Sequence, residues 1–226
     1  MKYPVILFWT DKENLNKLKN ITCLCPNSTY TTRDIQMMDW RGGDCYANKS
    51  IDDLVHHWYY PVTHEIGINI DELLNFKFNN MRKLLKALIE LKKKNLGFVG
   101  VWHSIYLWFK SAKVYNESVD LVMIEMYSSA KSSIWLWLRL MPSYFVAKMT
   151  GVWDKTIFAL KIDDTVKRTF KYKWIAGVPD EKTLEKQMRF IKKHCPDMAG
   201  IGFYESGGSE KLLLKADELA GRIFGR

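Results

Sequence analysis

Short apolar runs that end in polar or aromatic residues recur along the whole chain, with helical periodicity between several of them. Nearly continuous hydrophobicity over so few residues is typical of strands that are buried on both faces. The seven clear runs are Val5–Asp11, Ile35–Gly43, Ile66–Glu72, Phe98–Ser104, Val119–Tyr127, Ile157–Asp164 and Ala199–Ser206, and a weaker run, Ile21–Cys25, makes an eighth.

The intervening periodicity predicts helices over Asn79–Lys94, Ser132–Met149, Asp180–Lys193 and Ser209–Phe224. Asp180 follows a proline and begins one of them, a typical helix start. Strands that alternate with helices predict a parallel sheet with crossover helices.

Seven or eight such units in 226 residues favour a single (β/α)8 TIM-barrel-like domain over residues 1–226, compact or irregular at its N-terminal strands. The interval between Cys25 and Ile35 is too short for a crossover helix. One of these two strands is therefore expected outside the barrel, or the barrel is irregular. A doubly wound open sheet competes, but no Gly-rich turn follows Val5–Trp9.

Charge and hydrophobicity argue against a nucleic-acid partner and a membrane span. The formal charge is +9, yet the densest basic run, Arg82–Lys94, alternates with leucines at helical spacing, which indicates a solvated helix face rather than a nucleic-acid site. The apolar stretch Ser132–Trp153 contains Arg139, Pro142 and Lys148. It is therefore expected to pack on the domain and not to span a membrane, with an exposed surface for a partner as the alternative.

Sequons and cysteines add smaller constraints. Asn-x-Ser/Thr sequons occur at Asn20, Asn27, Asn48 and Asn116, which slightly favours an extracytoplasmic location. The four cysteines lack zinc-ribbon spacing, so buried thiols or one disulfide are expected and no metal or cofactor is implied. These cysteines are Cys23, Cys25, Cys45 and Cys195.

Polar and aromatic residues gather at the C-terminal ends of the predicted strands. In a parallel barrel these ends meet on one rim, where catalytic groups lie. Because successive strand residues point to opposite faces, an inward-facing subset can be predicted. It comprises Asn69, Asp71, Glu125, Tyr127, Lys161, Asp163 and Tyr204.

Two carboxyl groups in a low-dielectric mouth suit glycoside hydrolysis, in which one protonates the leaving oxygen and the other attacks or activates water. We expect Glu125 and Asp71 to form this pair, with Asp163 and Glu72 in reserve. The substrate would be a carbohydrate, with an acidic glycan as one option. The expected substrate-binding residues are Trp9, Asp39, Trp40, Trp102, His103, Tyr127, Lys161, Tyr204 and Glu205.

Three fragments resemble known proteins. Ile66–Glu72 (IGINIDE) resembles the Gly-Ile-Asp-Ile-Asp strand of chitinase-like TIM-barrel glycoside hydrolases, and Val119–Tyr127 resembles their later strand ending in Met-x-Tyr. Ala199–Tyr204 (AGIGFY) resembles a late strand of barrel glycosidases. The family's acid Glu lies two residues beyond its last Asp, whereas Glu72 adjoins Asp71, and the family has no counterpart of Glu125. The resemblance thus implies a glycosidase-like barrel without that family's substrate-assisted mechanism.

Other activities remain open. Lys161, pointing inward beside Asp163, suits a Schiff-base lyase or aldolase, and Gly207-Gly208-Ser209 could bind the phosphate of a carbonyl substrate. A barrel that binds sugar without cleaving it is another alternative. Metal-assisted hydrolysis would need Asp39, His103, Glu125 and Glu205 to meet, but no typical zinc motif is present. The pair His56-His57 is expected on the surface.

Overall fold

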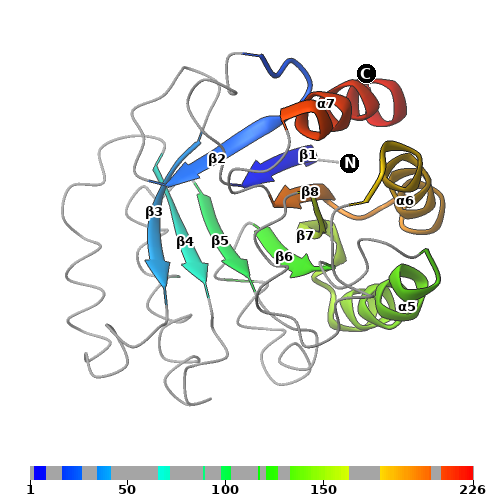
Figure 1. The fold of residues 1–226 in the computed structure, drawn as a ribbon. Coiled ribbons are helices and arrows are strands. Elements are labelled where there is room, and N and C mark those ends of the chain that lie inside the picture. The colour runs from blue at the N-terminus through cyan, green and yellow to red at the C-terminus, as the bar shows by residue number, and fades with distance from the viewer. Residues whose placement is uncertain are drawn as a thin grey trace.

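Eight parallel strands hydrogen-bond in chain order in the computed structural model, and the last pairs with the first, so that the sheet closes into a barrel (Figure 1). The structure describes residues 3–8, 17–26, 35–41, 66–71, 89, 98–102, 117, 121–126, 133–162, 179–204 and 210–225. The strands are β1 (Tyr3–Phe8), β2 (Thr22–Pro26), β3 (Ile35–Arg41), β4 (Ile66–Asp71), β5 (Phe98–Trp102), β6 (Leu121–Glu125), β7 (Thr156–Lys161) and β8 (Gly200–Tyr204). All eight predicted runs are therefore confirmed as strands.

The expectation that β2 or β3 lies outside the barrel is wrong. The two strands pair in parallel, with Leu24 opposite Ile35 and Pro26 opposite Met37. Eight residues separate them, and a chain of that length can span about 26–29 Å when extended. That reach exceeds the length of the five-residue strand β2, so the chain can return to the start of β3 without a helix. The irregularity that the described strands show lies at β1, whose register against β8 shifts between Tyr3 and Val5.

Three long helices are described: α5 (Ser133–Thr150), α6 (Glu181–His194) and α7 (Glu210–Phe224), with a short 3-10 helix, η4 (Trp153–Lys155), before β7. They confirm three of the four predicted helices within about one residue at each end. Of the fourth, Asn79–Lys94, only Ile89 lies within the described residues. The predicted helix start at Asp180 is also confirmed, because its carboxylate accepts a 2.6 Å hydrogen bond from the Thr183 N–H.

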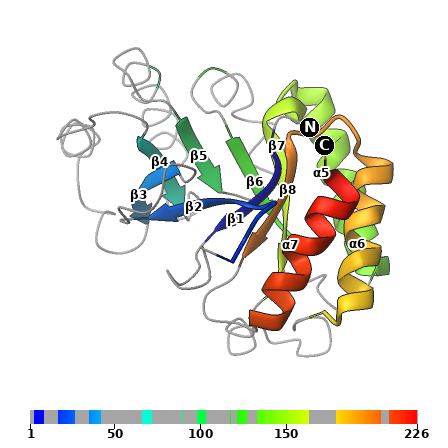
Figure 2. The same cartoon turned by 90° about the horizontal axis from the view of Figure 1, so that it is seen from above.

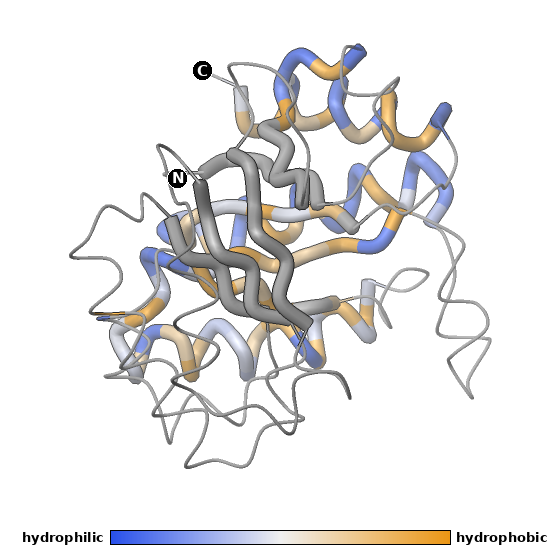
Figure 3. Tube along the Cα trace, turned by 90° about the vertical axis from the view of Figure 1, so that its left-hand side faces the viewer, coloured by the Kyte–Doolittle hydropathy of each residue, from blue (hydrophilic) through white to orange (hydrophobic). Residues whose placement is uncertain are grey.

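Helices α6 and α7 lie side by side along the outside of the barrel near β7, β8 and β1 (Figures 1 and 2). Each buries the apolar stripe that its sequence periodicity predicts, including Leu184 and Met188 of α6 and Leu213 of α7. Hydrophobic residues predominate on the strands that are coloured in Figure 3, which belong to β6, β7 and β8, whereas the helices alternate between hydrophobic and hydrophilic residues. Part of the hydrophobic core therefore lies between these two helices and the outer face of the sheet.

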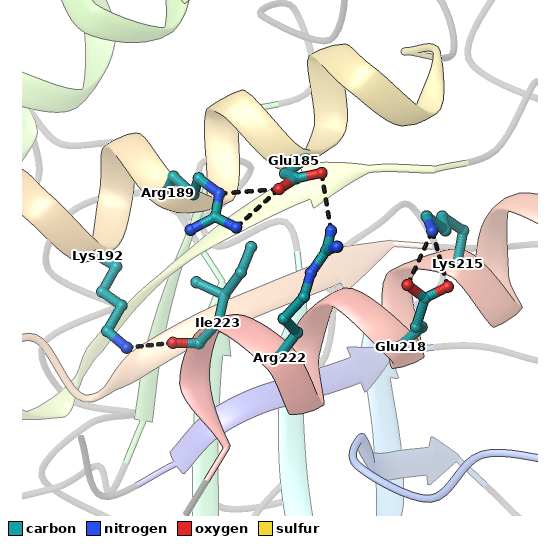
Figure 4. Close-up of polar contacts among 7 residues, drawn as sticks. All are labelled: Glu185, Arg189, Lys192, Lys215, Glu218, Arg222 and Ile223. Atoms are coloured by element: carbon teal, nitrogen blue, oxygen red, sulfur yellow. Dashed lines mark hydrogen bonds and ion pairs between the residues drawn. The ribbon is translucent and has the colours of Figure 1, made fainter.

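Polar contacts join α6 to α7 at the surface (Figure 4). Glu185 of α6 accepts 2.8 Å contacts from both Arg189 and Arg222, and the second of these arginines belongs to α7. Lys192 donates to the backbone oxygen of Ile223, a carbonyl at the C-terminal end of α7. These contacts hold α6 against the C-terminal turn of α7.

Helix α5 contacts α6, and Tyr144 and Lys148 of α5 both donate to the carboxylate of Asp197, which follows α6. Among the helices that the structure describes, none is long and apolar enough to cross a lipid bilayer.

Candidate functional site

Six consecutive strands end on residues with functional chemistry. Strands β3 to β8 have as their last residues Arg41, Asp71, Trp102, Glu125, Lys161 and Tyr204. Because all eight strands are parallel, these ends lie on one rim of the barrel. Five of these six residues are among those predicted from the sequence, and Arg41 is the sixth.

Register places these six residues on one face of the sheet. Arg41 is opposite Asp71, and Lys161 is opposite Tyr204. Residues that are opposite each other on neighbouring strands share a face, and residues two apart on one strand share it as well. When these two relations are applied from strand to strand around the barrel, the same face also carries Asp39, Asn69, Met123 and Gly202. We call the residues of this face the interior set.

This face is the interior of the barrel. A Cβ added at Gly202 of β8 would lie 3.1 Å from Ile157 Cδ1 and 3.4 Å from Met123 Sδ. Met123 belongs to β6, which is separated from β8 by β7. Side chains from alternate strands converge only on the concave side of a closed sheet. Met123 and Ile157 are buried and lie two and four residues before the rim residues of their strands, so the candidate site has an apolar floor.

Lys161 is the rim residue whose side chain the structure describes, and only 1 % of it is exposed. A lysine buried to this extent needs compensation by acceptors or a carboxylate, or else it becomes neutral, since burial disfavours the charged form. The sequence prediction that Lys161 faces inward is consistent with its register opposite Tyr204. Lys161 is therefore a buried amino group at the barrel's inner rim.

The remaining predicted residues fall into two groups. Trp40 is opposite Ile70 and belongs to the alternate register set, together with Met38 and Ile68. The others lie outside the described residues: Trp9, Glu72, His103, Tyr127, Asp163 and Glu205.

Arg41 is the residue that sequence reasoning missed. It ends β3 directly opposite Asp71 and two residues beyond Asp39. The signal was present in the parity of the run Ile35–Gly43, because Asp39 and Arg41 have the same parity. A search restricted to carboxylates and aromatics passes over it.

Titratable groups elsewhere in the described chain do not form a second site. Burial raises the pKa of the Cys195 thiol to about 12, so this thiol stays protonated. Within the described ranges, no cluster of His, Cys, Asp or Glu could hold a metal ion.

Comparison with known proteins shows a likeness of fold alone. No family model matches the chain, and no curated protein sequence matches it. The catalytic domain of a family GH18 chitinase from the fern Peteris ryukyuensis superposes with a TM-score of 0.54 at 13 % identity, covering 92 % of this chain and 73 % of that one. An endo-beta-N-acetylglucosaminidase from Cordyceps militaris gives 0.62 at 11 % identity, with coverages of 99 % and 91 %.

A third structure widens the comparison. An uncharacterized protein from Clostridium thermocellum that binds two copies of 5-methyl-5,6,7,8-tetrahydrofolic acid gives a TM-score of 0.52 at 11 % identity, covering 98 % of this chain and 95 % of that one. Two glycosidases and a folate-binding protein thus resemble this fold, as expected for an architecture that hosts many chemistries. The function must be argued from the rim residues of this chain.

Proposed function

We propose that residues 1–226 form a single (β/α)8 TIM-barrel domain that hydrolyses a glycosidic bond at the interior rim. The observation that carries the proposal is that strands β4 and β6 end on carboxylic acids, Asp71 and Glu125, within one interior register set. The fold likeness to a chitinase domain and to an endo-beta-N-acetylglucosaminidase supports it.

Each of the two acids has a cationic residue close to it on the interior set. Asp71 is opposite Arg41. Glu125 is opposite Ala159, and Lys161 lies two residues further along β7 on the same set. A cation beside one carboxyl group favours the ionised form that a nucleophile or a base requires. We therefore assign Glu125 and Asp71 as the acid/base pair, with Asp163 and Glu72 in reserve.

Separation of the two acids fits this chemistry. Only β5 lies between β4 and β6. Asp71 is level with Met123 of β6, and Glu125 lies two residues further along that strand. The two backbone positions are therefore about 12 Å apart, two strand spacings across and two residues along. Acid side chains from such positions can approach within the roughly 5–9.5 Å that glycosidases use. A separation near the short end produces retention of configuration, and one near the long end produces inversion.

A flat apolar surface and cationic groups would define the substrate. Trp102 and Tyr204 end their strands on the interior set, and aromatic rings of this kind can stack on sugar faces. Arg41 and Lys161 on the same set add positive charge. Together they favour an acidic glycan, because guanidinium groups pair bidentately with carboxylates.

The test is a screen of the purified chain against a panel of neutral and acidic glycans. Glu125→Gln and Asp71→Asn should each reduce kcat at least about a hundredfold on the glycan that is cleaved. Glu218→Gln, which removes an exposed carboxylate from α7, should leave the rate unchanged. Full activity in both rim variants would refute the assignment, and binding without cleavage by the parent chain would indicate a non-catalytic carbohydrate-binding barrel.

Lys161 supports a second candidate, a Schiff-base lyase or aldolase. Its burial at the interior rim favours the neutral amine that attacks a carbonyl group. The amine would add to the substrate carbonyl and release water to form an imine. Borohydride treatment in the presence of a phosphorylated carbonyl substrate would then trap a covalent adduct at Lys161, whereas a glycosidase would show none.

A further inference from the structure

Helix α5 is apolar on the side that is turned away from the barrel. Its buried side includes Leu136, Leu140 and Val146. At 100° per residue, the opposite side carries a stripe with helical spacing, which we call the outer stripe. It consists of Ile134, Leu138, Phe145 and Met149, with exposed fractions of 73 %, 46 %, 64 % and 61 %.

The neighbouring helices do not share this feature. The exposed residues of α6 are all basic: Lys182, Lys186, Arg189, Lys192 and Lys193. On α7, Leu214 is the exposed large apolar residue among charged ones. A continuous exposed apolar stripe on one helix of the three marks an interaction surface, since isolated exposed apolar residues are ordinary and contiguous ones are not.

Tryptophans border the outer stripe on both sides. Trp137 and Trp135 lie about 80° from its centre in opposite directions, and both are exposed. Indole rings favour the boundary between an apolar phase and water, with the ring in one and the N–H in the other. This arrangement suits a helix that lies in the plane of a lipid surface with the outer stripe directed into it.

Charge favours an anionic surface. Helix α5 contains no acidic residue, and its Arg139 is exposed, whereas Lys148 is paired with Asp197. The chain as a whole carries +9. Basic residues near an anionic leaflet each strengthen adsorption. We propose that the outer stripe of α5 docks the barrel onto the surface of an anionic lipid bilayer. The rim residues take no part in this contact, so it is independent of the proposed hydrolysis.

The test is flotation of the full chain with vesicles of phosphatidylcholine alone or of phosphatidylcholine mixed with phosphatidylserine. The parent should float with the mixed vesicles, show a blue shift of its tryptophan emission, and bind the neutral vesicles more weakly. Leu138→Ser should reduce the partition coefficient about tenfold. Leu214→Ser is the matched control, because it makes the same change at an exposed position of α7, and it should bind like the parent.

Three results would overturn the proposal: no flotation of the parent, equal loss in Leu138→Ser and Leu214→Ser, or dimerisation through α5 that Leu138→Ser abolishes without vesicle binding. Phe145→Ser provides a second removal from the outer stripe. Equal urea midpoints for parent and variants would exclude misfolding as the cause of lost binding.

Discussion

The carboxylate of Asp217, a buried residue of α7, accepts a 2.8 Å hydrogen bond from the backbone N–H of Asn20, which lies 197 positions earlier in the chain. The N–H groups of Lys19 and Ile21 donate to the same carboxylate at 3.1 and 3.0 Å. Asn20 Nδ2 adds contacts to the Asp217 carboxylate and backbone oxygen. One side chain thus holds the segment that enters β2 against the last helix.

Asp217→Ala is expected to lower the free energy of unfolding by about 3 kcal/mol, because it leaves several backbone donors without an acceptor. The N–H of Ile21 has the least access to water, since Ile21 is buried. Urea denaturation followed by circular dichroism measures the loss. Glu218→Ala, on the same helix and in an exposed pair with Lys215, should have little effect, and equal losses in the two variants would contradict this role of Asp217.

Gly221→Ala should destabilise the protein even though alanine normally favours a helix. A Cβ at Gly221 would lie 2.8 Å from Cγ, Nδ2 and Oδ1 of Asn20. The Asn20 side chain cannot easily withdraw, because its amide is bonded to Asp217. We expect a loss of about 1 kcal/mol or more.

A double-mutant cycle isolates this contact. Asn20→Ala removes all three crowded atoms, so Gly221→Ala should be neutral or stabilising in the Asn20→Ala background. Additive effects of the two substitutions in urea titrations would show that crowding is not the cause.

Burial of Cys195 predicts a loss of stability in alkaline solution. Its pKa is raised from 9.0 to about 12 by burial, so below pH 9 both the folded and the unfolded chain hold the proton. Between pH 9 and pH 12 the unfolded chain releases it and the folded chain does not, which favours unfolding. Burial also raises the pKa of Tyr144, which acts in the same direction.

The Cys195→Ala variant should therefore lose less stability than the parent as the pH rises through this window. Urea midpoints at a series of pH values measure both slopes, and parallel slopes would count against the assignment. In the folded parent near neutral pH, Cys195 should also resist alkylation, since thiolate is the reactive form.

How far the sequence predicts this structure depends on how local each signal is. Strand β4 and helix α6 are predictable because their hydrophobic patterns, period and end signals lie within a few residues. The pairing of β2 with β3 was not, because the expected crossover helix is a statistical rule and eight residues suffice for these short strands. The contact between Asp217 and Asn20 leaves no local pattern at all, since it joins residues from opposite ends of the chain.

For the rim, residue types and parity were readable, whereas the partner of each residue on the next strand was not. Arg41 opposite Asp71 is the clearest example, because register depends on how β3 and β4 align. The apolar outer stripe of α5 was readable only in part, because the stretch Ser132–Trp153 was expected to pack on the domain, with an exposed surface for a partner as the alternative.

Register separates two tryptophans that the sequence grouped together as substrate-binding residues. Trp102 ends β5 opposite Met123 on the interior set, and Trp40 of β3 is opposite Ile70 on the alternate set. Trp102→Ala should therefore raise KM for the cleaved glycan about tenfold or more through loss of a stacking surface, with little change in the urea midpoint. Trp40→Ala should instead leave KM nearly unchanged, because the alternate set lies on the outer face of the barrel, away from the interior rim. Steady-state kinetics and urea titration of both variants decide between them, and a rise in KM confined to Trp40→Ala would reverse the assignment of interior and exterior faces.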